Sequence, residues 1–221
     1  VTVTNVNETP VITSNGGGTT ATVNAAENQA AVATVTTTDA DGDTPTFSLS
    51  GGADSALFNI DASTGVLTFT AAPDFETATD ADTDGIYEVQ VRASDGTLFD
   101  DQLLSITVTN INETPVIISD GGAAAAAVNV AENQTAVTTV IVTDIDGDTP
   151  TFSITGGADS GLFSIDGGTG VLTFSSAPDF ESASDSNTDG IYEVEVTASD
   201  GNGGTDIQAI SVTVTNVNEA P

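Results

Sequence analysis

The chain has 221 residues and a formal net charge of −32, because 33 aspartates and glutamates stand against a single basic residue, Arg92. A chain with one cation cannot neutralise a phosphate backbone or an anionic membrane surface, so we expect neither nucleic-acid binding nor direct membrane insertion. Histidine, cysteine and tryptophan are absent, which excludes disulfides, Ser-His-Asp and Cys-His nucleophiles and the usual zinc sites. The natural counter-ion of such a chain is a hard cation held by oxygen ligands.

The sequence contains an internal repeat. Residues 39–96 and 144–201 are identical at 43 of 58 positions. The second copy has one extra residue between Asp200 and Ile207, which indicates a hairpin turn there. Prolines spaced by 105 and 106 residues mark the period: Pro10, Pro115 and Pro221.

The repeat predicts the domain organisation. Residues 1–10 have nearly the same sequence as the ends of both copies. We therefore expect residues 1–10 to be the last strand and linker of a preceding repeat, residues 11–115 to be repeat 1 and residues 116–221 to be repeat 2. The chain is then expected to be a piece of a longer array.

Alternation of apolar and polar residues predicts the strands of the first copy. They are expected, in chain order, over 31–38, 45–50, 57–60, 66–69, 86–93 and 103–110. An Asp95-Gly96 turn separates the last two, and no segment has a helical apolar stripe. About seven short strands per hundred residues predict an all-β protein of tandem immunoglobulin-like Greek-key β-sandwiches.

The apolar faces of these strands predict the core. Its members in the first copy are expected to be Val32, Val35, Phe47, Phe58, Ile60, Leu67, Phe69, Tyr87, Val89, Val91, Leu104, Ile106 and Val108.

Carboxylates collect at strand ends and turns. In the first copy they occur in "AAENQ", "DADGD", "PDFE", "DADTDG" and "ASDG", and "NINETP" ends the copy. Ca²⁺ takes about six to eight oxygen ligands from carboxylates, amides and carbonyls, so this pattern favours calcium. Phe75 and Phe180, which lie between acids, are expected to be packing residues that orient the carboxylates.

The order of these motifs resembles that of cadherin repeats, and more closely the cadherin-like repeats of bacterial surface proteins and giant RTX-type adhesins. Cadherin repeats carry x-E-N, D-x-D, L-D-R-E, A-x-D-x-G and a D-x-N-D-N linker before proline. The linker here is one residue shorter and begins with asparagine. The corresponding residues are Glu27-Asn28, Asp39 and Asp41, Asp74 and Glu76, Asp95, and Asn110, Asn112 and Glu113.

The resemblance implies where calcium binds, because in that family the ions lie between successive repeats. For the joint near Pro115 it implies the ligands Glu27, Asp74, Glu76, Asn110, Asn112, Glu113, Asp144, Asp146 and Asp200. The outer joints are incomplete, and we expect weaker or partial binding there. Their residues are Asn5, Asn7 and Glu8 with Asp39, Asp41 and Asp95 at one end, and Glu132, Asp179, Glu181 and Glu219 at the other.

The resemblance also predicts the function. Carboxylates about 4 Å apart repel by roughly 1 kcal/mol in water and about 4 kcal/mol near a protein surface, which Ca²⁺ would offset. We expect calcium-binding extender repeats of a bacterial cell-surface or secreted adhesin, located outside the cell, whose partners are the neighbouring repeats. The alternative is a calcium-dependent adhesion module that binds another copy or a surface polysaccharide directly.

Other interpretations of the acids are weaker. The loops 80–85 and 185–190 match the start of an EF-hand, but Val91 and Val196 stand where the bidentate glutamate is required. A simpler calcium site within these loops stays open beside their interpretation as ordinary turns. The "GGAD" segments are expected to be loops without a site. The chain is not expected to be an enzyme, since no tryptophan is present to stack a sugar beside paired carboxylates.

Overall fold

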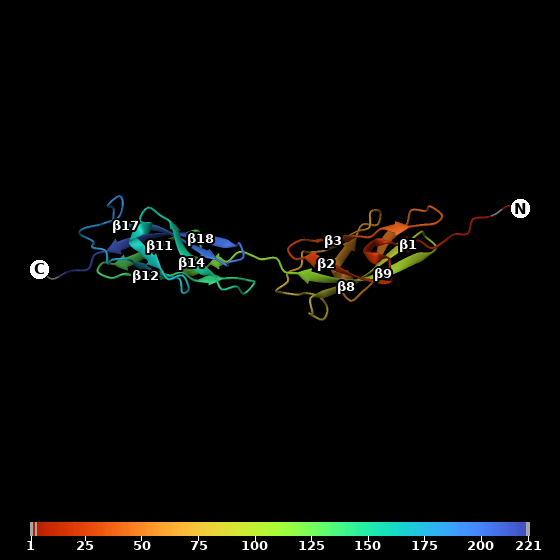
Figure 1. Ribbon diagram of the computed structural model, residues 1–221, viewed down its shortest axis with the longest axis horizontal. Coiled ribbons are helices and arrows are strands. Elements are labelled where there is room, and N and C mark those ends of the chain that lie inside the picture. Colours follow the sequence, from red (N-terminus) through yellow and green to blue (C-terminus); the bar gives the residue numbers. More distant parts are fainter. Residues whose placement is uncertain (1, 3, 220–221) are drawn as a thin grey trace. The chain divides into compact units, whose positions relative to one another are not determined.

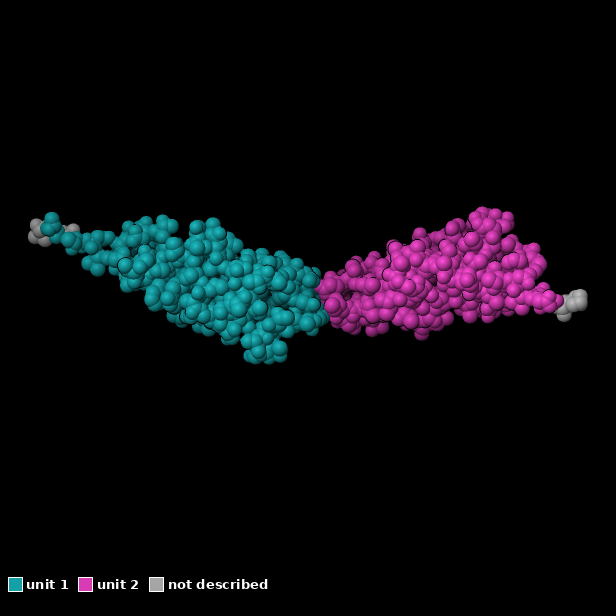
Figure 2. Space-filling model, turned by 180° about the vertical axis from the view of Figure 1, so that it is seen from behind, with its two compact units in different colours: residues 1–111 teal, residues 112–221 magenta. Residues whose placement is uncertain are grey.

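The computed structural model describes residue 2 and residues 4–219. The chain forms two compact units, Val1–Ile111 (unit 1) and Asn112–Pro221 (unit 2), which Figure 2 colours separately. In the described part of the chain each unit has nine strands and two short 3₁₀ helices. None of the helices in this described part is long and apolar enough to cross a membrane.

Unit 1 is built from three sheets of β-strands. Its elements are β1 (Val11–Ile12), η1 (Ser14–Gly16), β2 (Thr20–Ala26), β3 (Ala31–Thr34), β4 (Thr37–Thr38), β5 (Thr46–Gly51), η2 (Ser55–Leu57), β6 (Phe58–Ile60), β7 (Val66–Phe69), β8 (Ile86–Ser94) and β9 (Phe99–Thr109). The sheet orders are β2-β9-β8-β5, β3-β7-β6 and β1-β4, and only the β2-β9 pair is parallel. Figure 1 shows β2, β8 and β9 running together through the unit.

Unit 2 repeats this arrangement. Its elements are β10 (Val116–Ile117), η3 (Ser119–Gly121), β11 (Ala125–Ala131), β12 (Ala136–Thr139), β13 (Val142–Thr143), β14 (Thr151–Gly156), η4 (Ser160–Leu162), β15 (Phe163–Ile165), β16 (Val171–Phe174), β17 (Ile191–Ser199) and β18 (Thr205–Thr215). The sheet orders are β11-β18-β17-β14, β12-β16-β15 and β10-β13. The predicted insertion lies in the β17-β18 hairpin, where Ser199 pairs with Thr205.

Each unit has one apolar core, and the alternation of the long strands creates it. In β8 the odd residues from Tyr87 to Ala93 are buried and point between the sheets. The predicted core of unit 1 is confirmed for all of its members except Val32 and Ile60, which pack against it but are only partly buried. Ile12, Ala25 and Ala93 also belong to this core.

Several strand bounds differ from the sequence predictions, and β9 begins at Phe99 and not at residue 103. The expected strand over 31–38 is divided into β3, which pairs with β7, and β4, which pairs with β1 in a different sheet. Strands β1 and β2 had no alternation strong enough to predict them. The described part of residues 1–10, residue 2 and residues 4–10, contains no strand, and Val1 and Val3 lie outside the described residues.

Candidate metal centres

The fold gathers the predicted ligands of unit 1 at two places. The first is the C-terminal cluster of unit 1: Glu27, Asp74, Glu76 and Asn110. Glu27 follows β2 and Asn110 follows β9, and because these two strands pair in parallel, with Ala26 opposite Thr109, their ends meet. One carboxylate oxygen from each of the three acids lies within 4.8 Å of the others. Such a group of oxygens matches the ligand chemistry of Ca²⁺.

Backbone hydrogen bonds fix the central carboxylate of this cluster. Glu27 is 1% exposed, and its two oxygens accept the backbone N–H groups of Phe75 at 2.8 Å and Ile111 at 2.7 Å. Asn110 Nδ2 donates to Glu76 Oε1 at 3.0 Å. The prediction that Phe75 and Phe180 are packing residues is wrong, because their side chains are 48 and 47% exposed. Phe75 contacts Glu27 through its backbone N–H.

The C-terminal cluster of unit 2 has the same construction: Glu132, Asp179, Glu181 and Glu219. Glu132 is 3% exposed and accepts the backbone N–H groups of Phe180 and Val217, each at 2.8 Å. These two donors hold the pKa of Glu132 below its ordinary value. Oxygens of Glu132, Asp179 and Glu181 again lie within 4.8 Å of one another.

Two asparagines of this cluster were not predicted. Asn216 Nδ2 donates to a carboxylate oxygen of Glu181, and Asn133 Nδ2 donates to Glu219 Oε1 at 2.6 Å. Asn216 is the counterpart of Asn110, so the repeat alone was enough to find it.

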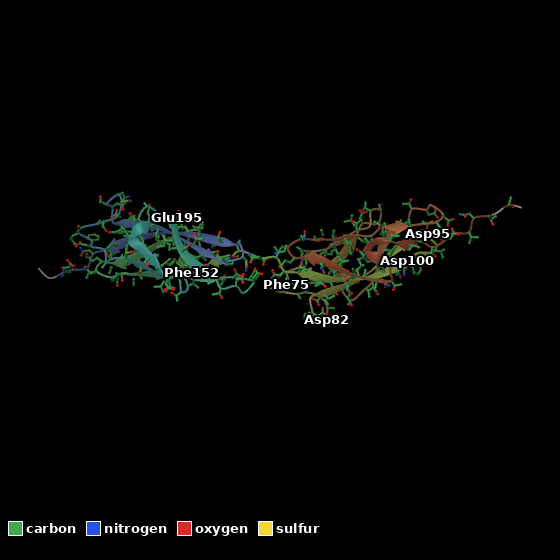
Figure 3. The ribbon with its side chains drawn as sticks, in the orientation of Figure 1. Phe75, Asp82, Asp95, Asp100, Phe152 and Glu195 are labelled. Carbon is green, nitrogen blue, oxygen red and sulfur yellow. The ribbon has the colours of Figure 1, made fainter. Side chains whose placement is uncertain are left out.

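The opposite end of unit 1 holds its N-terminal cluster: Asn5, Asn7, Glu8, Asp39, Asp41 and Asp95. Figure 3 shows Asp95 at one end of this unit and Phe75 at the other. Asp41 accepts Asn5 Nδ2 and, at 2.7 Å, the backbone N–H of Glu8. The N–H of Glu8 lowers the pKa of Asp41, whereas the charge of Asp41 raises the pKa of Glu8.

Asp95 occupies the tight turn between β8 and β9. The backbone N–H groups of Leu98 and Thr97 donate to its Oδ1 at 2.8 and 2.6 Å, and Asn7 Nδ2 donates to its Oδ2 at 2.9 Å. These bonds hold the pKa of Asp95 far below its usual range, with the Leu98 N–H as the largest cause. The carboxylate is therefore ionised and available to a cation at neutral pH.

The N-terminal cluster of unit 2 consists of Asn112, Glu113, Asp144, Asp146 and Asp200. Asn112 Nδ2 donates to Asp200 Oδ2 at 2.8 Å, and the backbone N–H of Glu113 donates to Asp146 Oδ2 at 2.7 Å. Asp200 is 9% exposed, and its pKa is lowered first by Asn112 and then by the N–H groups of its own turn. The predicted ligands of the joint near Pro115 thus belong to two clusters, one in each unit.

Asp39 and Asp144, the first aspartates of the two N-terminal clusters, each have a carboxylate oxygen without a hydrogen-bond donor in the described part of the chain. Asp39 Oδ2 and Asp144 Oδ2 are buried and accept no hydrogen bond from any described residue. Asp39 and Asp144 occupy equivalent positions of the repeat. A buried carboxylate oxygen without a donor costs roughly 1–3 kcal/mol, more when charged, unless a cation or water is bound to it.

The loops 80–85 and 185–190 are held by buried carboxylates. Asp80 and Asp185 are each 3% exposed, and each accepts backbone N–H groups from the end of its own loop. Oxygens of Asp80, Asp82 and Asp84 lie within 4.8 Å of one another. A hydrogen bond with Asp80, and then the charge of Asp84, raise the pKa of Asp82. Asp82 projects from the unit on this loop (Figure 3).

The "GGAD" segments have a structural task that the sequence did not reveal. Asp54 is 4% exposed and accepts the backbone N–H groups of Ala81 at 2.7 Å and Glu88 at 2.8 Å. Asp159 does the same in unit 2 for Ser186 and Glu193. Each of these aspartates fixes an acidic loop to its sandwich.

Comparisons with known proteins agree with this fold. Residues 20–110 match the family model of the cadherin domain, and residues 112–213 match that of a bacterial Ig domain. Human protocadherin-24 EC1-2 is similar at 21% identity and a TM-score of 0.60, with 94% of this chain and 99% of that chain covered.

Two longer structures are also similar. Mouse cadherin-23 EC22-24 has 20% identity and a TM-score of 0.52 over 94% of this chain and 65% of that chain. Protocadherin gamma B2 extracellular cadherin domains 3-6 have 17% identity and a TM-score of 0.52 over 94% of this chain and 51% of that chain. No match was found among the curated proteins.

These matches confirm the predicted all-β fold and the resemblance to cadherin repeats. The chain is made of tandem cadherin-like, immunoglobulin-type β-sandwich domains. Such domains are non-enzymatic adhesion or structural modules, and cadherin domains in general bind Ca²⁺.

Proposed function

We propose that the chain is a pair of calcium-binding extender repeats from a bacterial cell-surface or secreted adhesin, in which Ca²⁺ at the joints between repeats stiffens a rod outside the cell. The repeats are assigned to residues 11–115 and 116–221, with the last part of a preceding repeat in residues 1–10. The bacterial Ig-domain match of residues 112–213 supports a bacterial source.

The observation that carries this proposal is the pair of buried, donor-free oxygens, Asp39 Oδ2 and Asp144 Oδ2. A buried charged acceptor without a hydrogen-bond donor is matched best by a cation. Because such an oxygen occurs at the same position of both repeats, each repeat should bind the same kind of ligand there.

The proposed joint near Pro115 combines the C-terminal cluster of unit 1 with the N-terminal cluster of unit 2. Unit 1 would supply Glu27, Asp74, Glu76 and Asn110, and unit 2 would supply Asn112, Glu113, Asp144, Asp146 and Asp200. Without Ca²⁺ these carboxylates repel one another and favour separated repeats. Because Ca²⁺ binds the extended joint and not the separated repeats, it stabilises that state by RT ln(1 + [Ca]/Kd), about 2.7 kcal/mol per site at a hundredfold excess over Kd.

The affinity class supports a location outside the cell. Extracellular modules bind Ca²⁺ with dissociation constants of roughly 10⁻⁴–10⁻³ M. Only an extracellular calcium concentration fills sites of that affinity.

Distances between spin labels test the stiffening. The chain contains no cysteine, so the exposed turn positions Ser63 and Gly168 can be converted to cysteine and labelled without further changes. We expect the inter-unit distance distribution to be broad in EDTA and to narrow in Ca²⁺ but not in Mg²⁺. Adding Asp144→Asn should broaden it again. If Ca²⁺ leaves the distance distribution unchanged, the proposal that Ca²⁺ stiffens the joint is refuted.

A further inference from the structure

The outer face of one β-ribbon differs between the two units. In unit 2, β10 pairs with β13, with Val116 opposite Thr143 and Ile117 opposite Val142. Ile117 is buried, so the residues that alternate with it face outward. The outward aliphatic residues are Val116, Ile118, Ile141 and Ile145, with exposures of 51, 49, 53 and 56%. We call these four residues the unit 2 ribbon patch.

The equivalent ribbon of unit 1 is polar or small. Val11 corresponds to Val116, but Thr13, Thr36 and Ala40 stand where unit 2 has Ile118, Ile141 and Ile145. All three unit 1 positions are exposed as well. The fold needs no isoleucine there, since unit 1 builds the same ribbon, with Val11 opposite Thr38, without any. Exposed aliphatic residues that gather on one face and have no structural task mark an interaction surface.

Carboxylates lie at both ends of the unit 2 ribbon patch. At one end, a hollow of about 520 Å³ is lined by Glu113, Thr114, Val116, Thr143, Asp144 and Ile145. At the other end, Asp120 follows Ile118 by two residues and accepts the hydroxyl of Thr138 at 3.0 Å. Unit 1 has the neutral Asn15 at the position of Asp120. Unit 2 thus carries a negative charge, beside its isoleucines, that unit 1 lacks at this position.

Charge decides what kind of partner this surface accepts. The one basic residue of the chain, Arg92, lies in unit 1, so unit 2 has no cation that could neutralise the acidic ends. A second copy would bring carboxylates to carboxylates. The four aliphatic residues also expose an area on the order of a few hundred Å², well below the ~800 Å² per partner of a stable protein pair.

We propose that the unit 2 ribbon patch binds an extended segment of another protein that carries aliphatic side chains between lysines or arginines. The aliphatic side chains pack on Val116, Ile118, Ile141 and Ile145. The cationic group that follows the aliphatic side chains pairs with the exposed carboxylate of Asp120 beside Ile118, and Glu113 and Asp144 are left to the proposed calcium joint. This recognition goes beyond the proposed extender function and does not require calcium.

A synthetic peptide of the stated chemistry tests the proposal: acetyl-Lys-Lys-Val-Thr-Ile-Thr-Val-Lys-Lys-amide, labelled with a fluorophore and titrated by anisotropy with the full chain. The binding variant replaces the three isoleucines by their unit 1 counterparts, Ile118→Thr, Ile141→Thr and Ile145→Ala. Because unit 1 folds with these residues, the variant should retain the fold, which its circular dichroism checks. We expect at least a tenfold loss of peptide affinity, both in Ca²⁺ and in EDTA.

Two matched controls separate the apolar and charged contributions. Asp120→Asn, again the unit 1 residue, should weaken binding about three- to tenfold at low salt and less at high salt, because salt screens exposed charges. The reverse exchange in unit 1, Thr13→Ile, Thr36→Ile and Ala40→Ile, should create a second, weaker site. A peptide with glutamate in place of lysine should not bind.

Three results would overturn the proposal. The first is no binding of the lysine peptide by the unchanged chain. The second is equal binding by the triple variant. The third is concentration-dependent dimerisation in sedimentation that the triple variant abolishes, since the occupant would then be another copy. Failure of the calcium-dependent distance change leaves these readouts intact, so the two proposals fail separately.

Discussion

Replacing Asp144 by asparagine should change the stability of unit 2 in opposite directions with and without Ca²⁺. Asp144 Oδ2 is a buried carboxylate oxygen without a donor among the described residues. Asparagine keeps the shape and one acceptor but removes the charge. In EDTA it removes an unpaired charge from an acidic cluster, whereas in Ca²⁺ it removes a charged ligand.

The magnitudes follow from the cluster geometry. In the equivalent "DADGD" turn of unit 1, oxygens of Asp39, Asp41 and Asp43 lie within 4.8 Å of one another, a separation at which a like-charge contact costs about 1 kcal/mol in water-like surroundings. We therefore expect Asp144→Asn to raise the free energy of unfolding of unit 2 by about 1 kcal/mol in EDTA. In saturating Ca²⁺ this gain is opposed by weaker binding: a hundredfold weaker site costs about 2.7 kcal/mol, so the free energy of unfolding should fall by about 1.7 kcal/mol net.

Urea unfolding followed by tyrosine fluorescence measures this prediction. The chain has two tyrosines, Tyr87 and Tyr192, each buried in one unit, so in a Tyr87→Phe background Tyr192 reports on unit 2 alone. Glu195→Gln is the matched control, because Glu195 is exposed on β17 and unit 1 has glutamine at that position. Glu195→Gln should change the free energy of unfolding of unit 2 little, either in EDTA or in Ca²⁺. A shift of the same sign in both buffers for Asp144→Asn would refute the reasoning.

Three further predictions test the fold and its titration. Gly52→Ala should destabilise unit 1 by about 3 kcal/mol or more in urea unfolding, because a Cβ at its φ of +99° would lie 2.4 Å from the carbonyl oxygen of Glu88. Gly96→Ala is the control: its φ of +104° is similar but the space around it is open, so it should cost about 1 kcal/mol. Equal costs for the two substitutions would contradict the predicted clash. Asp54→Ala should cost about 2–4 kcal/mol, because the backbone N–H groups of Ala81 and Glu88 lose a charged acceptor in part-buried hydrogen bonds. Unchanged hydrogen exchange over 80–88 would argue against it. The lowered pKa of Asp95 means that its stabilisation is complete above the unfolded-state value near pH ~4 and is lost as pH falls toward the folded-state value. Asp95→Asn should therefore flatten the decline of the urea midpoint between about pH 4 and pH 2, and an unchanged slope would show that Asp95 does not contribute.

Much of the fold could be predicted because alternation and burial coincide in the long strands. Tyr87, Val89 and Val91 lie on one face of β8 by sequence and in the core by structure. Alternation failed for β2, whose sequence "TATVNAA" has small residues on both faces, and its parallel pairing with β9 is a long-range contact that no local pattern encodes.

The sequence predicted which residues belong to the candidate sites, but not which hydrogen bonds hold them in place. The motif order identified Glu27, but only the fold shows that backbone N–H groups of Phe75 and Ile111 hold it. Asp54 was missed because its partners lie 27 and 34 residues away in the chain. The half-exposed side chain of Phe75 could not be foreseen either, since a phenylalanine between acids gives no indication of which face it lies on.

The most direct measurement is thermal unfolding of the full chain in EDTA, in excess Mg²⁺ and across a Ca²⁺ titration. If the clusters at the ends of the units bind calcium, the melting temperature should begin to rise once Ca²⁺ reaches about 10⁻⁴–10⁻³ M and should then climb with the logarithm of the Ca²⁺ concentration. Mg²⁺ should have little effect, because it demands a smaller and more regular set of ligands. A melting temperature that Ca²⁺ does not change, or that Mg²⁺ raises equally, would contradict calcium-dependent repeats and leave the carboxylates as solvated surface.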